Sequence, residues 1–98
     1  MPFVQIIKFQ SSKLAELEAL LEGWAATETD GRVRRVLVCR DRNVADQHVH
    51  LAFFDSYEEA MVHSDLPETQ EFAARMTELV DGPPTFFDLD IVDDIEFD

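Results

Sequence analysis

Residues 48–63 read HVHLAFFDSYEEAMVH, an apolar strand pattern followed directly by the start signal of a helix. The pattern over 48–54 is typical of a β-strand with side chains on two faces. Ser56 followed three positions later by Glu59 is a capping box, in which the two side chains bond free N–H groups at the first turn of a helix. All three histidines of the chain lie in this stretch. It therefore predicts a strand, a helix that begins at Tyr57, and imidazoles close to both.

The rest of the chain supplies three more strands and two more helical patterns. Leucines recur at helical spacing over 14–24, after Ser11 and Ser12, whose hydroxyls are suitable N-caps. Pro67 interrupts the helical pattern that follows residue 57, and the pattern then resumes. The predicted elements are a strand at 2–10, a helix ending before 27, strands at 32–42 and 47–54, helical segments at 57–63 and 68–80, and a strand at 85–97.

The order is β-α-β-β-α-β, which is the split βαβ plan of ferredoxin-like domains. Right-handed crossovers place the helices on one face of a four-stranded antiparallel sheet ordered 4-1-3-2, so we predict a single α+β domain over 1–98. Ile6 and Phe53 fall on the opposite face, which would be open in a monomer. An apolar sheet face of that size predicts a second copy of the chain as partner. Cys39 lies in an apolar strand pattern, and we expect it to be a buried, inert thiol.

Composition excludes several classes of partner. The 98 residues carry a formal net charge of −13, which repels nucleic-acid backbones and anionic membrane surfaces. No apolar run approaches the length of about 20 residues that a membrane span requires. One cysteine cannot form an internal disulfide, and the first residues lack the pattern of a signal peptide, so we expect a cytoplasmic protein.

Residues 54–63, FDSYEEAMVH, followed by Pro67 and Phe72, resemble the dimeric α+β barrel proteins of the antibiotic-biosynthesis-monooxygenase type. In that family a strand ends in an aromatic residue, a Ser-x-x-Glu-Ala helix start follows, and a histidine stands nine residues after the aromatic. Phe54 occupies a place where tryptophan is usual, and Glu68 a place where a second histidine is frequent. The residue-level match is confined to this region, whereas the order of elements matches over the whole chain. The resemblance implies a homodimer whose sheets face each other, with a small hydrophobic pocket in each subunit.

The family to which this resemblance points includes cofactor-free monooxygenases that act on polyketide-like aromatics, isomerases, haem-degrading enzymes and proteins without known activity. Haem-degrading members also carry an asparagine in the first strand and a tryptophan near the end of the third. Only His63 matches their pattern here. We therefore expect no cofactor, and a pocket for a small apolar or aromatic ligand.

Two histidines are the candidate catalytic residues. An imidazole can move protons at neutral pH, and the resemblance places His63 at the pocket, with His50 as a second acid, base or orienting group. The alternative for His63 is a structural role, since on a helical wheel it lies at the flank of the inward face. The candidate ligand-binding residues, which could equally be ordinary core, are Trp24, Phe54, Tyr57, Phe72 and Met76.

His48 and His50 share one strand face, a spacing that can present two imidazoles to a metal ion. We favour polar lining over a metal site, because further ligands are missing. Two functions remain open. One is a small cofactor-independent monooxygenase or isomerase, and the other is a non-catalytic dimeric module that binds an apolar ligand.

The charges are unevenly distributed along the chain. Five of the six arginines lie within 32–42, whereas acidic residues crowd the last strand and the C-terminus. In the predicted sheet these two strands occupy opposite edges. We therefore expect them to meet across a dimer interface, where arginine–carboxylate pairs would fix the register. The alternative is that both are solvated edges that charge protects against aggregation.

Overall fold

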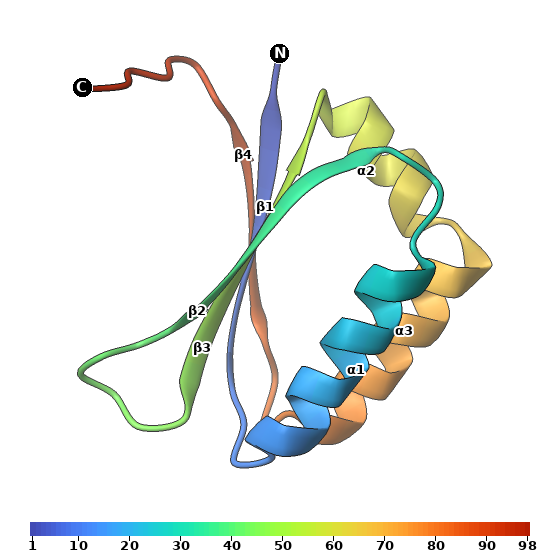
Figure 1. Ribbon diagram of the computed structural model, residues 1–98, viewed down its shortest axis with the longest axis vertical. Coiled ribbons are helices and arrows are strands. Elements are labelled where there is room, and N and C mark those ends of the chain that lie inside the picture. Colours follow the sequence, from blue (N-terminus) through green and yellow to red (C-terminus); the bar gives the residue numbers. More distant parts are fainter.

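The computed structural model describes residues 1–98 and contains a four-stranded antiparallel sheet with three helices on one of its faces (Figure 1). No helix is long and apolar enough to cross a membrane. In chain order the elements are β1 (Phe3–Gln10), α1 (Leu14–Thr27), β2 (Val33–Arg40), β3 (Gln47–Phe54), α2 (Tyr57–Ser64), α3 (Pro67–Leu79) and β4 (Thr85–Asp90).

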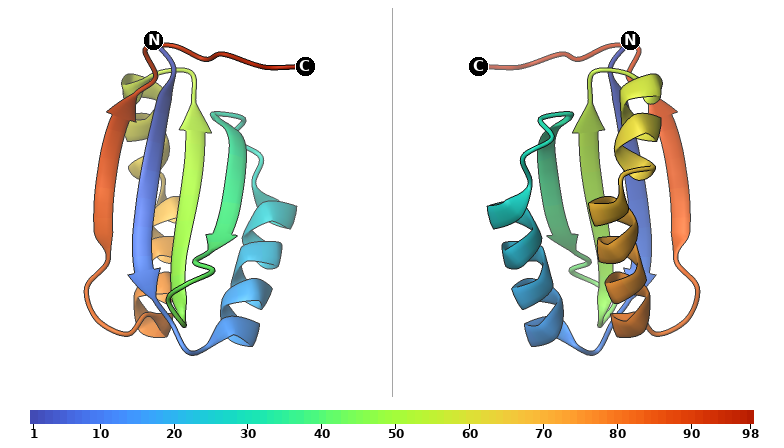
Figure 2. Two further views of the ribbon diagram at one scale, coloured as in Figure 1. Left: turned by 90° about the vertical axis from the view of Figure 1, so that its left-hand side faces the viewer. Right: turned by 90° about the vertical axis from the view of Figure 1, so that its right-hand side faces the viewer.

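The sheet order is β2-β3-β1-β4, which confirms the predicted topology and places β2 and β4 at opposite edges. Figure 2 shows all three helices behind one face of the sheet and the other face uncovered. A bulge between Val33 and Arg35 changes the alternation of β2. Val33 therefore packs on the helix side, against the cluster of Phe3 and Phe54, and not on the side of Leu37 as strict alternation predicts.

The capping box at the start of α2 is half confirmed. The Ser56 hydroxyl accepts a hydrogen bond from the Glu59 N–H at 3.1 Å, as predicted. The Glu59 carboxylate, however, turns away from the backbone and pairs with Arg32 Nε at 2.8 Å. The next helix, α3, begins at Pro67 itself, because proline is well suited to the first helical turn, where its missing N–H has no partner to lose.

The predicted serine caps of α1 are wrong. The helix begins after Lys13 without a side-chain cap. Ser11 is buried, and its hydroxyl donates to the Leu79 carbonyl at 2.6 Å, which ties the start of α1 to the end of α3. The Ser12 N–H donates to the Asp81 carboxylate at 2.9 Å.

Two other predictions change at the sheet edges. Cys39 is exposed, because it lies near the end of edge strand β2 on the face without helices. Strand β4 ends at Asp90, and the Ile91 N–H still donates to the Pro2 carbonyl at 2.8 Å. The residues after Ile91 run away from the sheet (Figure 2). The uncovered face still carries apolar side chains from all four strands, among them Val4, Leu51 and Phe87.

Candidate functional site

A cavity of about 290 Å³ lies between the helix side of the sheet and the helices. Six of the seven candidate site residues line it, and only Tyr57 does not. Tyr57 stacks edge-on against Phe3 and is 46% exposed. Histidines apart, no lining residue is ionisable, although the chain as a whole is rich in charge. The cavity is thus an apolar space with a few neutral polar groups, the usual character of a small-molecule site.

His63 points into the protein, whereas the helical wheel placed it at the flank of the inward face. Its side chain is buried, and Ala60, one turn earlier, is the other buried residue of α2. The imidazole lies between Trp24 and Phe54, with ring centroids 6.4 and 5.5 Å away. The short helix packs through Ala60 and His63, which rotates Tyr57 outward.

Glu28 is the partner of His63. Its Oε2 lies 3.2 Å from His63 Nε2, and its Oε1 accepts the N–H of Asp30 at 3.1 Å. Glu28 directly follows α1, whose last turn it closes by donating its N–H to the Trp24 carbonyl. Sequence reasoning missed this residue, because it stands 35 positions from His63 and no spacing rule connects a loop carboxylate to a distant helix.

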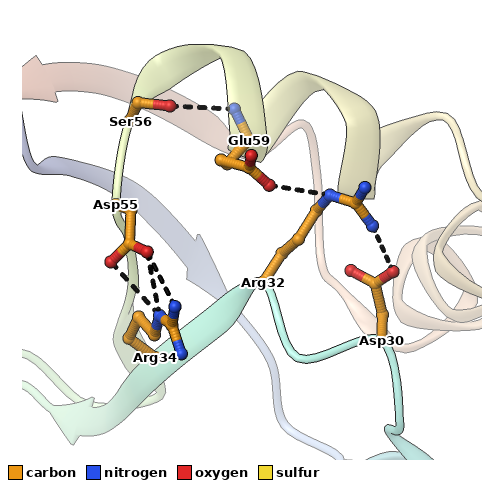
Figure 3. Close-up of polar contacts among 6 residues, drawn as sticks. All are labelled: Asp30, Arg32, Arg34, Asp55, Ser56 and Glu59. Carbon is orange, nitrogen blue, oxygen red and sulfur yellow. Dashed lines mark hydrogen bonds and ion pairs between the residues drawn. The ribbon is translucent and has the colours of Figure 1, made fainter.

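A group of ion pairs holds the loop of Glu28 against the start of α2 (Figure 3). Arg32 pairs with Asp30 on one side and with Glu59 on the other. Next to them, Arg34 Nη2 lies 2.7 Å from the Asp55 carboxylate. That hydrogen bond lowers the pKa of Asp55 and raises the pKa of Arg34. Both side chains of the Arg34–Asp55 pair are mostly exposed, so we assign the pair a role in orientation and not in stability.

His50 occupies a different environment from His63. It is buried on β3, edge-on to Phe9 at 4.9 Å between ring centroids, and its Nε2 has no hydrogen-bond partner in the protein. Burial, and to a smaller extent the neighbouring His48, lowers the pKa of His50 to about 4. The imidazole is therefore neutral at physiological pH.

His48 does not belong to the cavity. It is buried beside Phe9, with the two rings stacked at 5.4 Å, and its Nε2 lies 3.3 Å from the Ser11 carbonyl. His48 and His50 gather no third metal-ligating side chain. The one group of three forms at Glu28, Asp30 and His63.

Two further lining residues carry buried polar atoms without a partner in the protein. They are Trp24, through Nε1, and Thr69, through Oγ1. The Trp24 ring also stacks on Phe72 at 5.1 Å. Buried polar groups are normally paired, so these unpaired groups and His50 Nε2, all from the cavity lining, indicate places for the polar groups of a ligand or for water.

No protein-family model matches this chain, and no curated protein does. Solved structures match it over nearly its whole length. SnoaB, a cofactor-independent oxygenase from Streptomyces nogalater, gives a TM-score of 0.83 at 14% identity, with 96% of each chain covered. A candidate antibiotic biosynthesis monooxygenase from Caulobacter crescentus gives 0.82 at 18% identity, with 94% of this chain and 91% of that chain covered.

Rv0793 from Mycobacterium tuberculosis covers 98% of this chain and 100% of its own, with a TM-score of 0.79 and 19% identity. The chain shares the fold of these proteins. The resemblance noted in residues 54–63 to the antibiotic-biosynthesis-monooxygenase type is thus confirmed for the fold. Fold alone does not specify chemistry, which has to be argued from the cavity.

Proposed function

We propose that this protein binds a small, neutral aromatic molecule in the cavity and oxygenates it without a cofactor. The observation that carries the proposal is an apolar cavity that joins a carboxylate-paired histidine, His63, to an unpaired neutral histidine, His50. The fold shared with SnoaB, described as a cofactor-independent oxygenase, supports this proposal by analogy.

The cavity selects for size and charge. Its volume of about 290 Å³ is at the lower end of the range for ligand pockets, which suits a molecule of one or two rings. It offers no cation to pair with a carboxylate or phosphate, and the net charge of −13 adds to the cost of bringing an anion inside. A phenol or an enolisable aromatic ketone meets both conditions.

His63 is the proposed general base. In the proposed tautomer, His63 carries its proton on Nε2 and donates it to Glu28, so Nδ1 is free to accept a proton from the substrate. The Glu28 carboxylate then stabilises the imidazolium that forms. Glu28 is in turn held by the Asp30 N–H. A carboxylate that orients a histidine is the arrangement that proton transfer requires.

His50 is a poor base, because its pKa is about 4. We assign it a hydrogen bond to the hydroxyl or oxyanion of the ligand, together with the Trp24 N–H. These groups would stabilise the negative charge that develops when the substrate loses its proton.

In the proposed reaction the substrate supplies all the electrons. His63 removes a proton from an acidic methylene next to the aromatic ring, and the resulting carbanion or enolate reacts with O₂. The methylene carbon becomes a carbonyl, so one oxygen atom enters the product and the other leaves as water. The apolar walls keep bulk water away from the reactive anion.

We also propose that the protein is a homodimer formed through the uncovered sheet face. The half-buried and exposed apolar residues on that face give the reason, since exposed apolar patches of this kind mark association sites. The exposed free thiol of Cys39 suits a reducing compartment such as the cytoplasm.

A second candidate is a non-catalytic module that binds the same class of ligand. The neutral His50 favours it, because a histidine that does not titrate near pH 7 serves binding better than proton transfer. This candidate needs the cavity but makes no use of the His63–Glu28 pair.

The test begins with binding and then measures chemistry. Naphthol and 2-tetralone, whose acidic methylene lies next to the aromatic ring, should raise the melting temperature, whereas naphthoate, of similar size but anionic, should not. With a bound ketone, wild type should consume O₂ and place labelled oxygen in the product. The His63→Ala, His50→Ala double variant and Glu28→Gln should slow this by about 100-fold or more. Equal rates for wild type and the double variant would contradict the catalytic roles, and binding without turnover would favour the second candidate.

A further inference from the structure

Glu28, Asp30 and His63 each direct a potential metal ligand to one point at the rim of the cavity. One imidazole nitrogen and two carboxylate oxygens lie within 4.8 Å of one another. The three residues come from the loop after α1 and from α2, so the fold, and not a local sequence motif, brings them together. We propose that they form a site for a divalent transition-metal ion such as Zn²⁺.

The ligands are held in place before any ion binds. The buried His63 ring is fixed between Trp24 and Phe54. The Asp30 N–H binds Glu28 Oε1, which leaves Oε2 facing the imidazole. Hydrogen bonds of this kind around a ligand fix its orientation and strengthen metal binding.

One carboxylate oxygen of Asp30 is left without a partner by the ion pairs around it. Arg32 pairs with its Oδ2, but its Oδ1 is buried and has no partner. A buried carboxylate oxygen without a hydrogen bond is costly. An ion bound to this oxygen would satisfy it, and the same ion on His63 Nε2 would replace the proton that His63 shares with Glu28.

Solvent can reach the site without passing through the cavity. Glu28 and Asp30 line a surface hollow of about 330 Å³, together with Glu68 and Thr69. Water in this hollow would fill the coordination positions that three protein ligands leave open. The mixture of one nitrogen and two oxygens favours a first-row transition ion over Mg²⁺ or Ca²⁺, which prefer oxygen alone.

The inference goes beyond the proposed oxygenation, although both use His63. An ion on Nε2 would displace the proton that His63 donates to Glu28 and would so change the properties of the proposed base. Metal binding is measured without any organic ligand, so a protein that binds no metal could still oxygenate its substrate. Likewise, a protein that oxygenates no substrate could still bind the metal.

The test is a calorimetric titration of tag-free, chelator-treated protein with ZnCl₂. Wild type should bind about one ion per chain, and Glu28→Gln and Asp30→Asn should each weaken binding by about tenfold or more. Glu22→Gln is the matched control, because it removes the same charge from an exposed position on α1 and should bind as wild type does. Equal affinities for Glu22→Gln and Glu28→Gln, or no saturable binding, would overturn the proposal.

A second measurement needs no variant. Co²⁺ added to wild type should broaden the NMR signals of the His63 ring before those of His48, which lies outside the cavity lining. Signals of His48 and His50 that broaden first would place the ion elsewhere and would also overturn the proposal.

Discussion

His50 and His63 show how the environment of a side chain sets its chemistry. The same sequence stretch contains both, yet His63 faces a carboxylate and His50 faces phenylalanine. The strand and helix patterns predicted the elements that carry the two histidines, and the family resemblance placed both at a pocket. It could not distinguish their roles, because Glu28 approaches His63 only after the chain has folded.

The depressed pKa of His50 makes stability depend on pH. Its pKa is about 4 in the folded protein, against 6.5 as the usual value, so the unfolded chain binds the proton more tightly. The contribution of neutral His50 to the unfolding free energy is therefore fully present above about pH 6.5 and is lost as pH falls toward 4. The loss is at most about 3 kcal/mol.

His50→Leu should remove this part of the pH dependence. Chemical denaturation of wild type and variant between pH 7.5 and about pH 4 measures it, because contributions from other groups cancel in the difference. The stability of the variant relative to wild type should rise as pH falls. Parallel curves over this range would contradict the assignment.

At the scale of elements, the patterns with strong local causes were predictable and the tertiary adjustments were not. Ser56 caps α2 as predicted, because the N-cap geometry is local. The Glu59 carboxylate of the same motif pairs with Arg32, which is distant in sequence, and not with the backbone of its own helix. The Ser11 hydroxyl accepts the Lys13 N–H locally but donates to the Leu79 carbonyl at the end of α3, a contact that only the folded chain provides.

Removal of the Ser56 cap should destabilise the protein. Ser56→Ala should lower the unfolding free energy by about 1 kcal/mol, and Ser56→Asp should restore most of it, since aspartate is also a good N-cap. Ser12→Ala is the control and should have little effect, because the Ser12 hydroxyl caps no helix. Denaturant melts measure all three, and a loss in Ser56→Asp as large as in Ser56→Ala would argue against the cap.

In the whole molecule, the sheet leaves one face uncovered and carries charged strands at both edges. The topology was predictable from element order, because few connections of a split βαβ unit are allowed. Of the five arginines within 32–42, Arg32 and Arg34 form ion pairs within the chain. Arg35 lies over the Phe53 ring, with its guanidinium carbon 5.9 Å from the ring centroid. Arg40 and Arg42 remain for the predicted pairing with the acidic C-terminal residues of a partner.

Dimer formation can be tested by a charge placed on the uncovered face. Wild type should show twice the chain mass of 11.2 kDa by light scattering, and Leu51→Lys should shift it toward the monomer. Val62→Lys adds the same charge on the exposed side of α2 and should remain dimeric. High salt should weaken the wild-type dimer if arginine–carboxylate pairs cross it. Monomeric wild type would contradict the dimer, and salt-independent association would contradict only the pairing.

The most direct test of the proposed ligand binding in the cavity compares two neighbouring alanines of α3. Ala73 lines the cavity, whereas Ala74, also exposed on the same helix, does not. Ala73→Leu should fill part of the cavity and weaken naphthol binding in a calorimetric titration by about tenfold or more, which is about 1.4 kcal/mol. Ala74→Leu should bind naphthol as wild type does. Equal affinities for the two variants would contradict the account.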